Sequence, residues 1–337
     1  MQTIDWTKEQ VIVYGGNGFL GRYIVEHLIA VNCGKIKIFN RSAAPELAAM
    51  GVEVIRGDLR ELLAVTDAAK DCSIVFHTAA KAGVWGRYKT YYDINVRGTE
   101  NVLAACRTHN IKSLVYTSSP SVAYPPTCNI ENINEDEPYP EKYLAYYPET
   151  KAIAEKKVLG EPNKNLSSVT LRPHLLWGPR DPHLLPRVID AAQRGKLAII
   201  GDGLNRVDMT YIENAAHAHI LAAEYLKTQE SCVRKRYFIT DDHPVILWAW
   251  INDLLKELNI SQITRTITYN KAWQIARILE LIYKLLPCGE PPITRFAAGQ
   301  LAYSHYFDIA AAKHDLGYVP IVGNDKAMEL TLAWLKR

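Results

Sequence analysis

A glycine-rich segment near the N-terminus constrains the fold more than any other feature of this chain. It reads V-I-V-Y-G-G-N-G-F-L-G over residues 11–21, so that a short apolar run leads directly into regularly spaced glycines. Gly15 permits a tight turn, Gly18 lets the backbone approach a ligand, and Gly21 lets a helix pack closely on a strand. A helix that starts here offers unpaired N–H groups to phosphates. The pattern predicts a strand–turn–helix unit that binds a nucleotide; a glycine-rich turn without a ligand is the alternative.

Short apolar runs alternate with helical periodicity through the first half of the chain. Strands that alternate with helices of this length are typical of βαβ units around a buried parallel sheet. The sequence therefore predicts an α/β fold with a doubly wound, Rossmann-like parallel sheet over residues 1–172. Prolines crowd the chain after that point, and we expect residues 173–337 to form a smaller, mainly helical substrate-binding lobe with segments that return to the core. The expected strands are 11–14, 35–40, 53–57, 73–77, 113–118 and 169–172, and the expected helices are 21–30, 98–109 and 150–159.

Composition narrows the range of partners and compartments. The net charge of +3 argues against a nucleic-acid partner. No uncharged apolar stretch reaches the roughly 18 residues of a membrane span, and the first ten residues lack the apolar run of an export signal. Six scattered cysteines form no C-x-x-C pair, and the histidines show no metal-binding spacing. We therefore expect a cytoplasmic protein without a metal site.

Tyr147 and Lys151 are the residues expected to carry the chemistry. Residues four apart share one face of a helix, and Pro148 suits the first helical turn, where its missing N–H has no effect. A free tyrosine has a pKa near ~10, and a nearby ammonium favours the phenolate. The spacing predicts a Tyr147 hydroxyl whose pKa Lys151 lowers toward neutrality. The pair alone is a weak signal in a chain with 19 tyrosines, and its place after the fifth expected strand strengthens it.

These motifs, in their order along the chain, resemble the extended short-chain dehydrogenases/reductases. The likeness also rests on R-G-D-L at 56–59, H-T-A-A at 77–80, N-V-R-G-T at 95–99 and Y-T-S-S at 116–119. It implies that Tyr147 moves a proton and that Lys151 holds the nicotinamide ribose. It further implies that Ser119, with Ser118 as second choice, polarises the substrate oxygen, and that Asn95 supports Lys151 through water.

The same resemblance implies a set of cofactor-binding residues. They come from the glycine segment, the ends of successive strands, the catalytic helix and the start of the second half of the chain. The implied residues are Gly15, Asn17, Gly18, Phe19, Leu20, Gly21, Arg41, Ser42, Asp58, Leu59, Thr78, Ala79, Ala80, Tyr147, Lys151 and Pro173.

The second expected strand bears on which nicotinamide cofactor binds. An acidic residue at its end usually holds a ribose 2′-hydroxyl, whereas a cation suits a 2′-phosphate. The strand ends I-F-N-R-S over 38–42, with no carboxylate and with Arg41 in place to pair with a phosphate. NADP(H) is favoured and NAD(H) remains possible; a merely solvated Arg41 is the alternative interpretation.

Within these dehydrogenases the chain is most similar to the 3β-hydroxysteroid dehydrogenase-like branch. The segments that carry this likeness are 116–122, 171–174, 177–179, 181–186, 304–309 and 316–320. Further likeness at 289–296 is to bacterial ketone reductases of long-chain olefin biosynthesis. That resemblance implies NADPH-dependent reduction of a 2-alkyl-3-ketoalkanoic acid to the 3-hydroxy acid. Alternatives are a 3β-hydroxysteroid or sterol dehydrogenase, a sugar-nucleotide epimerase, and a non-catalytic NAD(P) sensor.

Residues 272–286 predict a helix with a wide apolar face. Arg277, Glu280 and Lys284 fall on one narrow polar stripe, and the other positions are largely apolar. A plain core helix is one interpretation. The others are a wall of a pocket for a hydrophobic small-molecule substrate, a contact in a homodimer, and a peripheral membrane contact. A homodimer is expected by analogy with the family.

Overall fold

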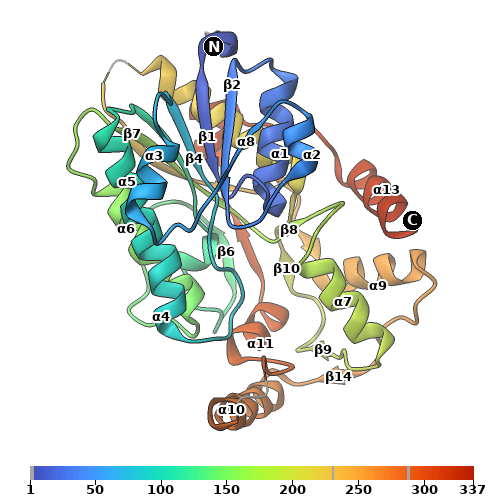
Figure 1. Ribbon diagram of the computed structural model, residues 1–337. Helices are drawn as coiled ribbons and strands as arrows, with labels where there is room; N and C mark the ends of the chain where they lie inside the picture. The colour runs from blue at the N-terminus through green and yellow to red at the C-terminus, as the bar shows by residue number, and fades with distance from the viewer. Residues whose placement is uncertain (1–3, 230, 287–288) are drawn as a thin grey trace.

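A computed structural model describes residues 4–229, 231–286 and 289–337. Its centre is a parallel sheet of seven strands in the order β12-β7-β5-β4-β1-β2-β3 (Figure 1). The predicted α/β fold with a doubly wound parallel sheet is confirmed. The strands are β1 (Gln10–Tyr14), β2 (Lys35–Asn40), β3 (Glu53–Arg56), β4 (Ile74–His77), β5 (Ser113–Thr117), β7 (Ser167–Pro173) and β12 (Arg234–Ile239).

Helices cover both faces of this sheet. On one face α1 packs against α8, which also contacts β5 and β7, and on the other α3, α5 and α6 pack side by side. Figure 1 shows these two layers on either side of the strands. The helices of the core are α1 (Phe19–Ala30), α2 (Pro45–Ala49), α3 (Leu62–Ala68), α4 (Tyr88–Tyr91), α5 (Gly98–Thr108), α6 (Tyr146–Leu159), α8 (Ile212–Thr228) and α12 (Ala310–Leu316).

Strand residues alternate between two apolar clusters, one on each face of the sheet. In β1, Val11 and Val13 belong to the cluster under α1 and α8, whereas Ile12 and Tyr14 belong to the cluster under α3 and α5. All four side chains are buried. Burial on both faces explains why residues 11–14 of β1 form a continuous apolar run. The loops of the site follow the carboxyl ends of these buried strands.

The second half of the chain contributes both to this core and to a separate lobe. Strand β12 joins the sheet and α8 covers it, while the lobe holds a four-stranded sheet in the order β13-β10-β15-β6 and two pairs, β11-β8 and β14-β9. Its strands are β6 (Ile130–Ile133), β8 (Leu176–Trp177), β9 (Ile199–Ile200), β10 (Arg206–Val207), β11 (Thr210–Tyr211), β13 (Val245–Ile246), β14 (Thr266–Ile267) and β15 (His305–Phe307). Its helices are α7 (Leu184–Gln193), α9 (Leu247–Glu257), α10 (Tyr269–Leu285), α11 (Arg295–Ala302) and α13 (Asn324–Leu335).

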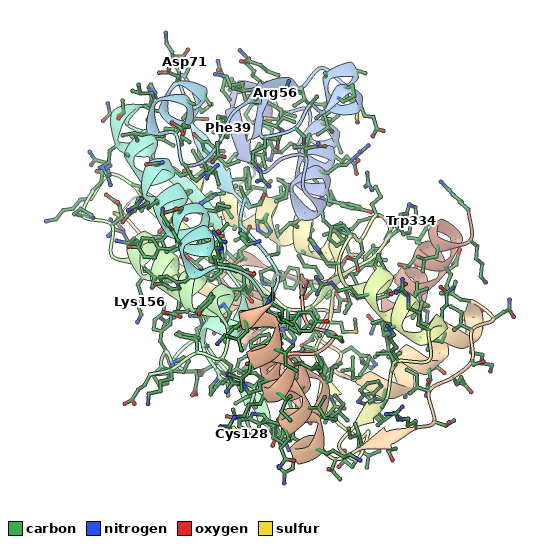
Figure 2. All side chains as sticks on the ribbon, turned by 60° about the horizontal axis from the view of Figure 1, so that its bottom comes forward. Phe39, Arg56, Asp71, Cys128, Lys156 and Trp334 are labelled. Atoms are coloured by element: carbon green, nitrogen blue, oxygen red, sulfur yellow. The ribbon has the colours of Figure 1, made fainter. Side chains whose placement is uncertain are left out.

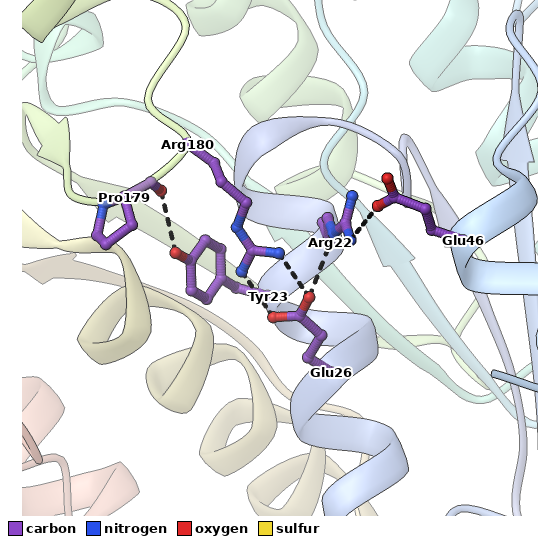
Figure 3. Close-up of polar contacts among 6 residues, drawn as sticks. All are labelled: Arg22, Tyr23, Glu26, Glu46, Pro179 and Arg180. Atoms are coloured by element: carbon purple, nitrogen blue, oxygen red, sulfur yellow. Dashed lines mark hydrogen bonds and ion pairs between the residues drawn. The ribbon is translucent and has the colours of Figure 1, made fainter. Parts of the chain in front are cut away.

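A network of charged and aromatic groups joins the loop after β8 to α1. Arg180 donates two hydrogen bonds to the carboxylate of Glu26, at 2.6 and 2.7 Å, and its guanidinium lies 4.1 Å from the centre of the Tyr23 ring. The Tyr23 hydroxyl donates to the carbonyl of Pro179, and Arg22 also bonds Glu26 (Figure 3). Helix α1 starts at the glycine segment, which is expected to hold the cofactor. These contacts therefore connect the loop after β8 with the expected cofactor site.

Helix α10 contains all but the last residue of the amphipathic segment predicted over 272–286. Ala272, Ala276 and Glu280 are the buried residues of this helix, and its large apolar side chains are mostly exposed. The interpretation as a plain core helix is therefore wrong. The three polar residues of the predicted stripe differ in environment: Glu280 is buried and binds Arg295, whereas Arg277 and Lys284 are exposed. Within the described ranges, no helix is both long and apolar enough to cross a bilayer.

Candidate active site

Lys151 lies in the interior of the protein, one turn into α6. The helix starts at Tyr146 with Pro148 in its first turn, as the sequence predicts for the tyrosine–lysine pair. The Lys151 ammonium donates a 2.6 Å hydrogen bond to the carbonyl of Thr117, at the end of β5, and lies 4.1 Å from the centre of the Tyr116 ring. Burial lowers the pKa of Lys151 to about 7. The group can therefore gain or lose its charge near neutral pH.

Tyr147 lies at the start of the same helix and is partly exposed. Exclusion of water raises the pKa of its hydroxyl above the usual value, although the side chain of Ser119 acts in the opposite direction. The expectation that Lys151 lowers this pKa toward neutrality is wrong for the protein alone, because desolvation dominates. Tyr147 consequently holds its proton at neutral pH.

Ser119 follows β5 and is the hydroxyl that the fold brings to Tyr147. It caps the 3₁₀ helix Pro120–Val122, and its side chain accepts from the backbone N–H of Ser121 and shares a 2.9 Å hydrogen bond with the Ser121 hydroxyl. Ser118 is buried, and its hydroxyl makes no hydrogen bond within the described part of the chain. Of the two serines, Ser119 is the one beside the phenol.

Asn95 is buried on a π-helical turn (Tyr92–Arg97) between α4 and α5. Such turns occur often at functional sites. Its amide accepts a 2.7 Å hydrogen bond from the backbone N–H of Lys81 and donates a 3.0 Å bond to the hydroxyl of Thr150. Thr150 is the residue before Lys151, so Asn95 connects the segment after β4 directly to α6. The water-mediated link to Lys151 stays a prediction.

A buried ion pair beneath Lys151 was missed by the sequence reasoning. Glu155, one further turn along α6, accepts a 3.2 Å hydrogen bond from Nε of Arg172 and a 2.6 Å bond from the hydroxyl of Tyr139. Both members of the pair are 0% exposed. Burial opposes ionisation of Glu155, but Arg172 outweighs it and holds the pKa below the usual range. The sequence did hold one indication of this site: Glu155 lies four residues after Lys151, and residues at that spacing share one face of a helix.

The glycine segment has the geometry that a pyrophosphate requires. Gly15 adopts φ +89°, and a Cβ there would lie 2.8 Å from the backbone N of Ala79. A Cβ on Gly21 would lie 2.1 Å from the carbonyl oxygen of Gly15. Gly18 is exposed and precedes α1 without a side-chain cap, so the first turn, which carries Phe19 and Leu20, leaves its N–H groups open. A side chain at Gly15 or Gly21 would collide with the backbone of the turn, so this close strand–turn–helix geometry, which fits a dinucleotide, requires glycine at both positions.

The end of β2 forms the rim where the adenosine ribose would lie. The Asn40 side chain accepts a 2.9 Å hydrogen bond from the backbone N–H of Asn17, whose own amide donates to the Ser42 hydroxyl and the Ala43 carbonyl. The buried Nδ2 of Asn40 has no hydrogen-bond partner within the described part of the chain. Arg41 is exposed. An unpartnered donor and an exposed cation suit the oxygens of a nucleotide.

The remaining predicted cofactor residues surround the same sheet edge. Thr78 and Ala79 both donate from their backbone N–H groups to the carbonyl of Tyr14, which places them beside the glycine turn. Asp58 is engaged by Arg60 through two side-chain hydrogen bonds, which lower the pKa of its carboxyl. Three others lie at strand ends or just beyond: Leu59, buried; Ala80, exposed; and Pro173, buried as the last residue of β7.

Comparison with known proteins identifies relatives along almost the whole chain. Residues 12–269 match the model of the 3-beta hydroxysteroid dehydrogenase/isomerase family. A 2-alkyl-3-oxoalkanoate reductase of Stenotrophomonas maltophilia is 44% identical over 95% of this chain and 97% of its own. Another, from Shewanella oneidensis, is 44% identical over 94% of this chain and 84% of its own. The human decarboxylating sterol-4-alpha-carboxylate 3-dehydrogenase is 36% identical over 95% of this chain and 86% of its own.

Solved structures share the fold at lower sequence identity. The UDP-glucose 4-epimerase of Thermus thermophilus, solved with NAD, has a TM-score of 0.71 at 23% identity and covers 97% of this chain and 99% of its own. MoeE5 in complex with UDP-glucose and NAD gives 0.75 at 24% identity with the same coverage. At this identity the likeness establishes the architecture alone.

Proposed function

Because this chain belongs to the 3-beta hydroxysteroid dehydrogenase/isomerase family, a family of oxidoreductases, we propose that it reduces a ketone on a hydrophobic substrate with NADPH. The substrate that we favour is a 2-alkyl-3-ketoalkanoic acid, which becomes the 2-alkyl-3-hydroxyalkanoic acid. The observation that carries the proposal is the position of Tyr147 beside Ser119, one turn from a buried Lys151, at the sheet edge that holds the glycine cradle. The names of two relatives at 44% identity support the substrate.

Each residue of the site has its own role in the proposed reduction. When bound, the nicotinamide supplies a hydride for the carbonyl carbon. Tyr147 donates its proton to the carbonyl oxygen as negative charge develops there, and its raised pKa keeps that proton available. Ser119 donates a hydrogen bond to the same oxygen. Lys151, which now bonds the Thr117 carbonyl, would hold the ribose hydroxyls and favour the phenolate that remains.

The substrate class is tested by comparing two assays on the purified protein. We expect NADPH oxidation with 2-alkyl-3-ketoalkanoic acids and little reduction of NAD with 3β-hydroxysteroids. A sterol dehydrogenase is the second candidate, because the human sterol enzyme is 36% identical over most of both chains. Turnover of the steroid alone would overturn the proposed substrate but would leave the assignment as an oxidoreductase in place. Turnover of neither, with NADPH bound, would favour the sensor alternative.

Replacement of Arg41 tests the choice of NADPH. Arg41 is exposed beside Ser42 at the end of β2, where it can pair with a 2′-phosphate. Loss of a charge-assisted bond of about 1.5–3 kcal/mol should make Arg41→Ala bind NADPH about 10- to 100-fold more weakly, with little change for NADH. Fluorescence titration with both nucleotides measures this. Arg60→Ala, which removes a neighbouring cation already engaged by Asp58, is the control. Equal weakening of both nucleotides by Arg41→Ala would refute the assignment.

A further inference from the structure

Lys81 is a partly buried cation just beyond the carboxyl end of β4, directly after the residues predicted to support the cofactor. Its ammonium lies 4.9 Å from the centre of the Tyr91 ring, and Tyr91 is 0% exposed. Among the described residues, this ammonium forms no ion pair and no hydrogen bond. A cation that rests on an aromatic ring without an anion beside it can bind a negatively charged ligand.

The loop after Lys81 fixes the position of this side chain. The Tyr91 hydroxyl donates to the carbonyls of Gly83 and Trp85, at 2.9 and 3.0 Å, so that the loop closes around the ring. A Cβ on Gly86 would lie 3.7 Å from Cε of Lys81 and 3.3 Å from Cε2 of Tyr91. The stem of Lys81 therefore lies beside Gly86 and over the ring. Its ammonium is held in place before a ligand arrives, which reduces the entropy lost on binding.

A short chain of hydrogen bonds connects Lys81 to the helix that carries Tyr147. Asn95 accepts from the backbone N–H of Lys81 at 2.7 Å and donates to its carbonyl at 3.3 Å. The same amide donates to the hydroxyl of Thr150, which lies 3.1 Å from the carbonyl of Tyr147. Helix α4, which ends at Tyr91, packs against α6, and Figures 1 and 2 show the two helices side by side. These contacts hold Lys81 at a fixed position relative to the proposed proton donor.

The ring under the Lys81 ammonium also lies within electrostatic reach of the reacting phenol. Exclusion of water raises the pKa of Tyr91 to about 12, and the Glu290 carboxylate and the Tyr147 hydroxyl add to the rise. Arg187 is a second cation that acts on this hydroxyl, in the opposite direction. Two hydrogen bonds, of 3.2 and 3.0 Å, already join Arg187 to Glu290. Of these two cations, Lys81 is the one without an anion among the described residues.

We propose that Lys81 binds the carboxylate of the substrate, and that this contact selects ketones that carry an acid group next to the reacting carbonyl. The proposal rests on the proposed function, in which the ketone is a 2-alkyl-3-ketoalkanoic acid. In that acid the carboxyl carbon and the carbonyl carbon are bonded to the same atom, so a carboxylate held by Lys81 orients the carbonyl oxygen toward Tyr147 and Ser119. A hydrogen bond between an ammonium and a carboxylate is charge-assisted and therefore strong. The nucleotide phosphates are another source of an anion, and the experiment distinguishes the two.

The test compares a 2-alkyl-3-ketoalkanoic acid with its methyl ester, which has the same ketone and no charge. In Lys81→Met we expect kcat/KM for the acid to fall by about 10- to 100-fold, mainly through KM, and that for the ester to change by less than about twofold. KM for NADPH should stay near that of the parent. Lys81→Arg keeps the charge and should retain most of the preference for the acid. The matched control is Lys89→Met, because this exposed lysine of α4 is paired with Asp93, and its kinetic constants should equal the parent's.

A Lys81→Met variant that keeps the parent's preference for the acid would overturn the proposal. Weaker binding of NADPH by that variant would then assign the ammonium to a nucleotide phosphate, and loss of the preference in Arg187→Met would assign the carboxylate to Arg187. Equal losses with the acid and the ester would also overturn it, since the substitution would then disturb the site as a whole. A parent that reduces neither compound would instead refute the proposed function, and with it the substrate that this proposal requires.

Discussion

Tyr147→Phe should lower kcat for ketone reduction by about 10³-fold, within the 10²- to 10⁴-fold range typical of proton transfer by a positioned side chain. The variant removes the hydroxyl that gives its proton to the carbonyl oxygen and retains the ring. Nucleotide binding should change little, because the glycine cradle and Lys151 are untouched. Steady-state NADPH oxidation gives kcat, and fluorescence titration gives the affinity for NADPH.

The adjacent tyrosine is the matched control for this variant. Tyr146 also lies in the first turn of α6, is 37% exposed, and packs edge-on against the ring of Tyr88. Tyr146→Phe removes an equivalent hydroxyl from the same turn and should leave kcat near that of the parent. If Tyr147→Phe kept more than about a tenth of the parent's kcat, or if both variants lost activity equally, Tyr147 would not be the proton donor.

Glu155→Ala should lower the free energy of unfolding by about 3–5 kcal/mol, the cost typical of leaving one member of a buried ion pair alone. Arg172 is 0% exposed, and the carboxylate of Glu155 neutralises its charge. Glu155 also accepts a hydrogen bond from the hydroxyl of Tyr139. Removal of the carboxylate leaves a buried guanidinium without its anion. Denaturant-induced unfolding of the parent and the variant measures the change.

Two control variants separate the buried charge from the general effects of mutation. Glu155→Leu/Arg172→Met removes both charges and keeps much of the volume, so it should recover most of the lost stability. Asp190→Ala breaks the exposed pair between Asp190 in α7 and Arg194, the residue that follows this helix, and should cost less than about 1 kcal/mol. If the double variant were as unstable as Glu155→Ala, the loss would come from packing rather than from the unpaired guanidinium.

Local patterns in the sequence were sufficient to predict six of the seven strands of the sheet, all but β12, and the two motifs of the site. The segments at 11–14 and 35–40 form β1 and β2 because residues 11–14 and 36–40 are buried whichever face they point to. The glycines at 15 and 21 are required by contacts with immediate neighbours in the strand–turn–helix unit. Tyr147 and Lys151 share a face of α6 because four residues make about one helical turn. Each of these properties depends on a short stretch of chain.

Other properties arise only when segments distant in sequence pack together. Glu155 and Arg172 become a buried pair because α6 lies against β7. The pKa of Tyr147 rises because surrounding segments exclude water, an effect that outweighs any charge on its own helix. Glu280 turns inward because Arg295 from α11 lies beneath it, and this contact decides which side of α10 faces solvent. Periodicity determines which residues share a face, but burial and the energies of charged groups depend on what that face meets in three dimensions.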